Sequence, residues 1–167
     1  MPDFFCSEEI VPDGGLTVEG PQLERVNFRS RRHSPHPLTY TERNRMFTPR
    51  THALMRSPLN IGEIKNADGI GTAGVKGETT FMKMWLSLKD GVIADIRFKI
   101  YGCLPNAATG SIVTEAARNR SLDEALQIDE AFILSELGGL PPEKRHCASL
   151  AVACLQNAIQ DARARQV

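Results

Sequence analysis

The sequence predicts an α+β fold in which a small antiparallel sheet of about three strands packs against four to five helices. Apolar residues alternate with other residues over positions 81–88 and again over positions 92–101, which is the period of half-buried strands. The Asp90-Gly91 pair between the two segments is typical of a tight hairpin turn. Helical patterns follow these strands as a block, an order that favours an α+β sandwich over a doubly wound parallel sheet.

Each strand of this hairpin is expected to turn one apolar face toward the helices. Successive side chains of a strand point to opposite sides, so alternate residues form the buried face. An isolated hairpin is marginally stable in water, and the apolar face therefore needs a cover. On the second strand the expected face consists of Val92, Ala94, Ile96, Phe98 and Ile100.

A short helix and a glycine-spaced segment precede the hairpin. Thr48 is suited to cap the helix and Pro49 to occupy its first position, while Pro58 should end it. Residues 67–75 are punctuated by glycine, and we expect either an edge strand or a loop there.

Four helical segments are expected after the hairpin. Proline opens the first and the last of them, and Ser121 with Glu124 forms a capping box at the start of the second. Gly138-Gly139 should end the third. The expected limits are residues 105–118, a short segment from 121, residues 129–137 and residues 141–164.

Composition indicates an ordinary soluble protein. The chain has 167 residues, 41% hydrophobic and 24% charged, which suits one domain with a real core. No apolar run approaches the length of a membrane span, and the acidic start lacks the pattern of a secretory signal. We therefore expect a cytoplasmic protein with no membrane partner and four reduced cysteines.

The first 40 residues are expected to form an extended or disordered arm ahead of a folded domain of residues 41–167. They are rich in proline, glycine and arginine and show no sustained apolar period. Residues 1–24 carry six acids and no lysine or arginine, whereas residues 25–56 carry eight arginines and one acid. The absence of interleaved aromatic residues favours a solvated arm over a nucleic-acid-binding one.

Three residues could act together on a metal ion. Cys103 follows the second hairpin strand, and His146 and Cys147 lie in the first turns of the last helix. If the helices after the hairpin pack on one sheet face with their starts together, the three side chains converge at one end of the sheet. Thiolates and imidazole are ligands of zinc and iron, and helix starts favour the thiolate form. A buried cysteine can also be only a small apolar residue, and Cys154 is interpreted in that way.

Several segments, in this order, resemble the NifU/IscU family of iron–sulfur cluster scaffold proteins. The resemblance runs from about Phe47 to Val167. It implies the α+β fold of that family, a scaffold without enzymatic activity, and Cys103, His146 and Cys147 as ligands. The similar segments are Ser57–Gly62, Ala67–Gly71, the hairpin Asp90–Cys103, Thr114-Glu115, Ser121–Ala125 and the proline motif with the His-Cys pair, Leu140–Cys147.

The family's first ligand cysteine, part of a Cys-Gly-Asp motif, has no counterpart here. Ungapped alignment places Glu78 at its position, where a carboxylate could complete the site. A gapped alignment pairs Lys76-Gly77-Glu78 with the motif instead, and Glu78 then replaces the aspartate. In both registers a thiolate is missing.

The resemblance implies a scaffold or carrier that accepts sulfur from a cysteine desulfurase and passes a cluster to client apo-proteins. A chaperone that recognises Leu140–Lys144 is a further expected partner, and nucleic acid is not. The mixed ligand set suits a transient [2Fe–2S] cluster or a single iron ion, and it also suits zinc. Two alternatives stay open: a metal-binding regulatory relative that binds the desulfurase or a client without building clusters, and a sulfur acceptor that uses one thiolate.

Overall fold

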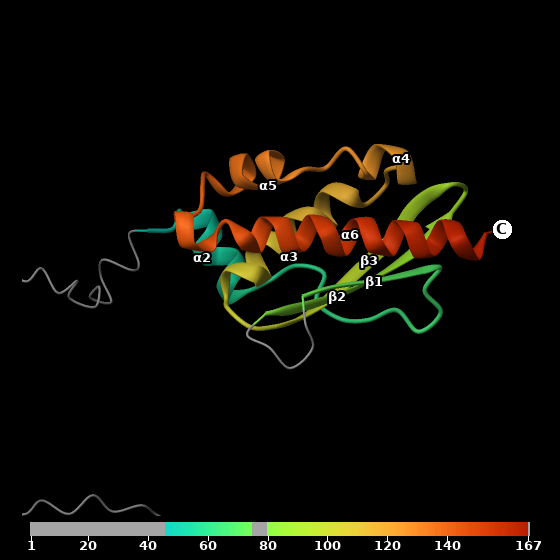
Figure 1. The fold of residues 1–167 in the computed structure, drawn as a ribbon, viewed down its shortest axis with the longest axis horizontal. Coiled ribbons are helices and arrows are strands. Elements are labelled where there is room, and N and C mark those ends of the chain that lie inside the picture. The colour runs from blue at the N-terminus through green and yellow to red at the C-terminus, as the bar shows by residue number, and fades with distance from the viewer. Residues whose placement is uncertain (1–45, 75–79, 167) are drawn as a thin grey trace, which may run out of the picture. The chain divides into compact units, whose positions relative to one another are not determined.

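The computed structural model describes residues 46–74 and 80–166 (Figure 1). The expected arm, residues 1–40, lies outside these ranges, and so does Glu78. No helix within the described ranges is long and apolar enough to cross a membrane.

The sheet has three antiparallel strands in the order β1 (Gly69–Gly74), β2 (Phe81–Lys89) and β3 (Val92–Tyr101). The hairpin between β2 and β3 is confirmed, and Asp90 and Gly91 both adopt positive φ, 53° and 79°. Such a turn matches the twist of the strands it joins. The glycine-spaced segment is confirmed as an edge strand, β1, which pairs with β2.

The expected buried face of β3 is wrong at its beginning. Ile93 is fully buried, whereas Val92 is half-buried and Ala94 is exposed. The pairing passes from Ser87–Asp95 to Leu88–Ile93, so Ala94 is an extra residue in β3. This β-bulge shifts the alternation by one position, and the side chains before it change sides.

The described part of the chain contains five helices, in agreement with the expected four to five, and three of their starts have side-chain caps. Thr48 accepts a hydrogen bond from the backbone of Thr51, and Asp129 caps a further helix. Ser121 and Glu124 form the expected capping box. The helices are α2 (Pro49–Arg56), α3 (Pro105–Ala117), α4 (Leu122–Ala125), α5 (Glu130–Leu137) and α6 (His146–Arg165).

The last helix begins later than expected. A 3₁₀ turn, η1 (Pro142–Lys144), precedes it, and α6 starts only at His146. Pro142 holds Pro141 in an extended conformation, with φ −53° and ψ 146°, and so the helix cannot start at the proline pair. His146 and Cys147 consequently lie in the first turn of α6.

Helix α6 lies directly against the edge strand β1, where glycine makes room for it (Figure 1). A Cβ on Gly71 would lie 2.2 Å from the backbone oxygen of Cys154, and a Cβ on Gly69 would lie 2.3 Å from that of Ala158. Asp161 of α6 accepts a hydrogen bond from the backbone N–H of Ile70 at 2.7 Å. The helix thus covers the apolar face and also satisfies part of the exposed strand edge.

Helix α3 is the centre of the helical layer. Eleven of its thirteen residues, including polar ones, are buried, because it packs against α2, α5, α6 and β3. A Cβ on Gly110 would lie 2.3 Å from the ring of Phe98, so α3 presses closely on β3. The starts of α3 and α6 are thereby fixed near the end of β3.

Candidate metal centre

Three sequence-predicted ligands meet where β3 ends and α6 begins. Cys103 lies in the short link between β3 and α3, behind Gly102, whose φ of 136° turns the chain. His146 and Cys147 open α6. Cys147 is buried, Cys103 is half-buried and His146 is exposed, so the group reaches the surface on one side.

The distances between the three donor atoms suit one metal ion. The Sγ atoms of Cys103 and Cys147 are 3.6 Å apart, and Nε2 of His146 lies 3.6 Å from Sγ of Cys147. All three atoms lie within 4.8 Å of one another. Bond lengths of tetrahedral zinc place two sulfur ligands about 3.8 Å apart and a sulfur and a nitrogen ligand about 3.6 Å apart. The residues therefore fit a borderline metal ion with little rearrangement, and the expected convergence is seen.

Burial controls the charge of Cys147. It raises the pKa of this thiol to about 12, and the neighbouring sulfur of Cys103 acts in the same direction. The positive charge of Lys144 opposes the rise but is a smaller effect. The expectation that a helix start makes Cys147 a thiolate is therefore wrong in the absence of metal. A metal ion that binds here has to displace a proton.

Three residues near Cys103 in the chain were not proposed as site residues from the sequence: Tyr101, Leu104 and Asn106. Tyr101 and Leu104, on either side of Cys103 in the chain, are 63% and 64% exposed. Asn106 is fully buried, and its side chain has no hydrogen-bond partner within residues 46–74 and 80–166. The signal that could have pointed to Asn106 is its position in the sequence, three residues after Cys103 and directly after Pro105.

The fourth cysteine has the structural role that was expected. Cys154 is fully buried, and its thiol contacts the backbone oxygens of Gly71 and Met82 at 3.5 Å. Burial raises its pKa to about 12. Cys154 is thus a neutral core residue between α6 and the sheet.

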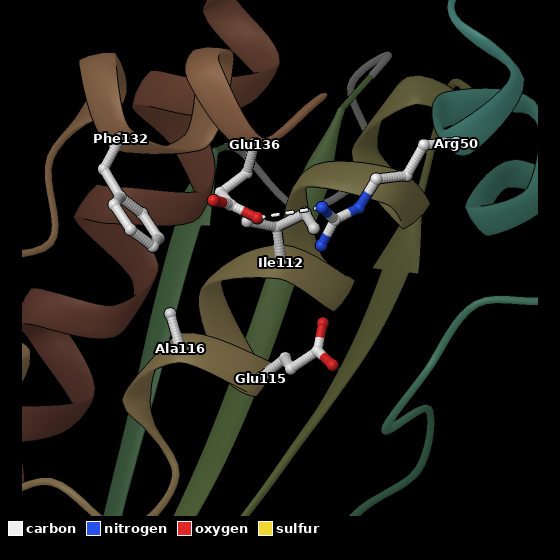
Figure 2. A pocket seen from close by; sticks show the side chains of 6 residues that line it. All are labelled: Arg50, Ile112, Glu115, Ala116, Phe132 and Glu136. Atoms are coloured by element: carbon white, nitrogen blue, oxygen red, sulfur yellow. Dashed lines mark ion pairs between the residues drawn. The ribbon is translucent and has the colours of Figure 1, made fainter. Parts of the chain in front are cut away.

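A pocket of about 290 Å³ opens between α2, α3 and α5, apart from the cysteines (Figure 2). Its rim carries an ion pair between Arg50 and Glu136, 3.0 Å from nitrogen to oxygen. Glu115 lies beside this pair, and the remaining lining is apolar: Ile112, Ala116 and Phe132. No lining residue is a cysteine or histidine, so this pocket is not the metal centre.

The fold is an α+β domain that brings a Cys-His-Cys group, which could hold a metal ion, together at one end of the sheet. The chain belongs to the NifU-like N-terminal domain family, whose profile matches residues 47–167. The resemblance seen in the sequence is confirmed by this match.

Curated relatives are similar over most of the described chain. The iron-sulfur cluster assembly scaffold protein IscU of Escherichia coli (strain K12) is 40% identical over 114 residues, which are 66% of this chain and 88% of the relative. One such scaffold protein of Archaeoglobus fulgidus is 38% identical over 116 residues, which are 70% of this chain and 76% of the relative.

A solved structure supports the fold. The crystal structure of the N-terminal part of a nitrogen-fixing NifU-like protein from Brucella abortus aligns with a TM-score of 0.56. The alignment covers 71% of this chain and 95% of that one at 17% sequence identity. At this identity the likeness shows the α+β architecture alone.

Proposed function

We propose that this protein is an iron–sulfur cluster assembly scaffold or carrier whose metal site is formed by Cys103, His146 and Cys147. The observation that carries the proposal is the convergence of two sulfur atoms and an imidazole nitrogen within 4.8 Å at one end of the sheet. Similarity to IscU scaffold proteins at 38–40% identity supports it. The cluster, a transient [2Fe–2S] unit, or iron alone is cargo in this proposal, and the protein is not an enzyme.

The exposure of the ligands suits cargo that enters and leaves. Cys103 and His146 reach the surface, and Cys147 anchors the site from within. Two thiolates and an imidazole form a harder set than three thiolates, and such a set holds iron less strongly. Glu78 completes the site as a carboxylate ligand in this proposal, which rests on the sequence alignment.

Sulfur reaches the site from a cysteine desulfurase through Cys103, the more accessible of the two thiols. The Cys103 thiolate attacks the terminal sulfur of a persulfide on the donor enzyme. A new S–S bond forms on Cys103, the S–S bond of the donor breaks, and the donor cysteine leaves as a thiolate. Client apo-proteins are the proposed acceptors of the finished cluster, and the cytoplasm is the proposed location.

A chaperone is the further proposed partner, at the segment Leu140–Lys144. Pro142 and Glu143 are exposed there, whereas Leu140 and Pro141 are buried. Lys144 and Arg145 separate this exposed pair from His146 and Cys147 in the chain. A protein bound to this segment would thus lie next to the metal site.

A second candidate function is a metal-binding regulator that binds the desulfurase or a client without building clusters. The observation that favours it is the donor spacing, which already matches a single tetrahedral ion. A regulator would hold zinc or one iron ion at this site and would incorporate no sulfide.

An anaerobic assay with a cysteine desulfurase, cysteine and ferrous iron separates these functions. We expect a persulfide on Cys103 by mass spectrometry, together with weak or transient cluster absorption in the visible range. Cys154→Ala is the matched control, since it removes a cysteine remote from the site. A bound metal ion with neither persulfide nor cluster absorption would contradict the scaffold proposal and favour the regulator.

A further inference from the structure

Asn106 carries a buried carboxamide without partners, next to the metal centre. It lies in the first turn of α3 and is fully buried, yet neither Oδ1 nor Nδ2 has a hydrogen-bond partner among the described residues. A buried amide that gives up its bonds to water without replacement destabilises the fold. An unpaired group of this kind requires an explanation, and an ion or ligand bound in the functional state is one.

The other buried polar residues make this exception clear. Thr51, Thr109, Ser111 and Thr114 are also fully buried, and each hydroxyl donates to a backbone oxygen. Three of these four residues lie on α3 itself. Polar groups within this helix are thus satisfied locally, whereas the side chain of Asn106 is not.

The backbone places Asn106 beside Cys103. The N–H of Asn106 donates to the carbonyl oxygen of Cys103 at 3.1 Å, and Leu104 between them has helical dihedrals, φ −55° and ψ −37°. Residues three apart in a helical turn have Cβ atoms about 5–6 Å apart. Cys103 is half-buried and Asn106 is fully buried, so the two side chains occupy neighbouring positions of one turn at different depths.

We propose that Asn106 is a positioning residue of the metal centre, whose Nδ2–H donates a hydrogen bond to the Cys103 sulfur when that sulfur is bound to metal. A thiol sulfur is a weak acceptor, whereas a metal-bound thiolate carries negative charge and accepts more strongly. Hydrogen bonds to ligand sulfur tune the metal and fix the orientation of the ligand. Metal binding thereby provides the partner that Asn106 lacks.

This inference rests on the proposed metal site, and cobalt(II) titration of the full chain tests both. The variant Asn106→Leu keeps a similar side-chain volume and removes both polar atoms. Its metal-free form should be as stable as the wild type or more stable, because an unpaired polar group is removed. Its cobalt affinity should fall about tenfold, as for other outer-shell partners of metal ligands.

The absorption spectrum gives a readout that a merely structural role would not change. Loss of an N–H···S bond makes the thiolate a stronger electron donor, so the thiolate-to-cobalt charge-transfer band should move to lower energy. Thr109→Val is the matched control: it removes a buried hydroxyl one turn further along α3, and affinity and band should stay at wild-type values. Asn106→Ala serves as a second variant if the leucine variant does not fold.

Unchanged affinity and an unchanged band in the Asn106 variants would overturn the inference and leave the metal site intact. Failure of the wild-type chain to bind one cobalt ion would overturn the metal site and the inference together. The two failures are therefore distinguishable within one titration.

Discussion

At the scale of single residues, the proposed metal centre combines one accessible sulfur with one buried sulfur. Cys103 is half-buried and suited to receive sulfur, whereas Cys147 is fully buried and protonated until a metal ion displaces its proton. The two sulfurs lie 3.6 Å apart, so both can coordinate the same metal ion. The division of roles follows from burial and not from the identity of the residues.

Removal of either sulfur is expected to abolish stable metal binding. Cys103→Ala and Cys147→Ala each leave one thiolate, one imidazole and the proposed Glu78 carboxylate, one ligand fewer than a structural four-coordinate site needs. Metal content after anaerobic purification should fall at least about tenfold in both. Cys154→Ala should keep the wild-type content, and an unchanged stoichiometry in both site variants would exclude this site.

Glu78 is expected to complete the site in place of the missing cysteine. Glu78→Cys should then lengthen the lifetime of a reconstituted cluster, because a soft thiolate replaces a hard carboxylate. The decay of visible absorption under chelator challenge measures this lifetime. If yield and lifetime stay at wild-type values, the ungapped alignment that places Glu78 at the site is wrong.

At the scale of elements, close packing of α6 on β1 holds Cys147 opposite Cys103. Gly71 allows this approach because it has no Cβ. Asp161 and Asn157 of α6 bind the backbone of Ile70 and Thr72, both at 2.7 Å. The helix is thereby fixed along the strand, and its first turn is held at the end of the sheet.

Gly71→Ala is expected to destabilise the fold by about 1–3 kcal/mol, since overpacking of a tight contact forces the backbone to move. The added Cβ would lie 2.2 Å from a backbone oxygen, and no side chain can yield there. The urea midpoint of unfolding measures the effect. Thr72→Ala, on the exposed face of the same strand, is the control and should change stability by less than about 0.5 kcal/mol. Equal midpoints for the two variants would mean that α6 does not pack as described.

At the scale of the whole molecule, the sequence predicted the fold and the convergence of Cys103, His146 and Cys147 better than it predicted the surroundings of these residues. Asp90-Gly91 identified the hairpin because few other turns use such a pair. The bulge at Ala94 was not predicted, because it changes the pairing of β3 with β2 and leaves no mark in the residue types of the strand itself. Cys147 was expected to be a thiolate because helix position is readable from sequence, whereas its burial depends on tertiary packing. The unpaired state of Asn106 was not predicted either, because the partners of a buried side chain also depend on tertiary packing.

The stability of the molecule should depend on pH partly through Asp161. A hydrogen bond from the Ile70 N–H, assisted by Arg165, lowers the pKa of this carboxyl in the folded state. A lowered folded pKa adds stability above the unfolded pKa of about 3.9, and this stability is lost as pH falls through the folded value.

Asp161→Asn should therefore be less stable than the wild type at pH 7, and the difference should shrink toward pH 2. Glu115→Gln, which removes a carboxylate of the pocket rim, is the control. A difference independent of pH in urea titrations would contradict the role of the charge.

Residues 1–40 are expected to be dispensable for folding of the domain that follows. They lack an apolar period, and so they cannot bury enough surface to offset the conformational entropy lost on ordering. The described domain has its own core, built from all three strands and all five helices.

Deletion of residues 1–40 should thus shift the melting temperature by less than about 2 °C, which corresponds to well under 1 kcal/mol for a domain of this size. Cobalt affinity of the shortened chain should equal that of the full chain, because no proposed ligand lies in the deleted segment. A melting temperature lowered by 5 °C or more would mean that the arm packs on the domain and that the acidic and arginine-rich halves serve the fold.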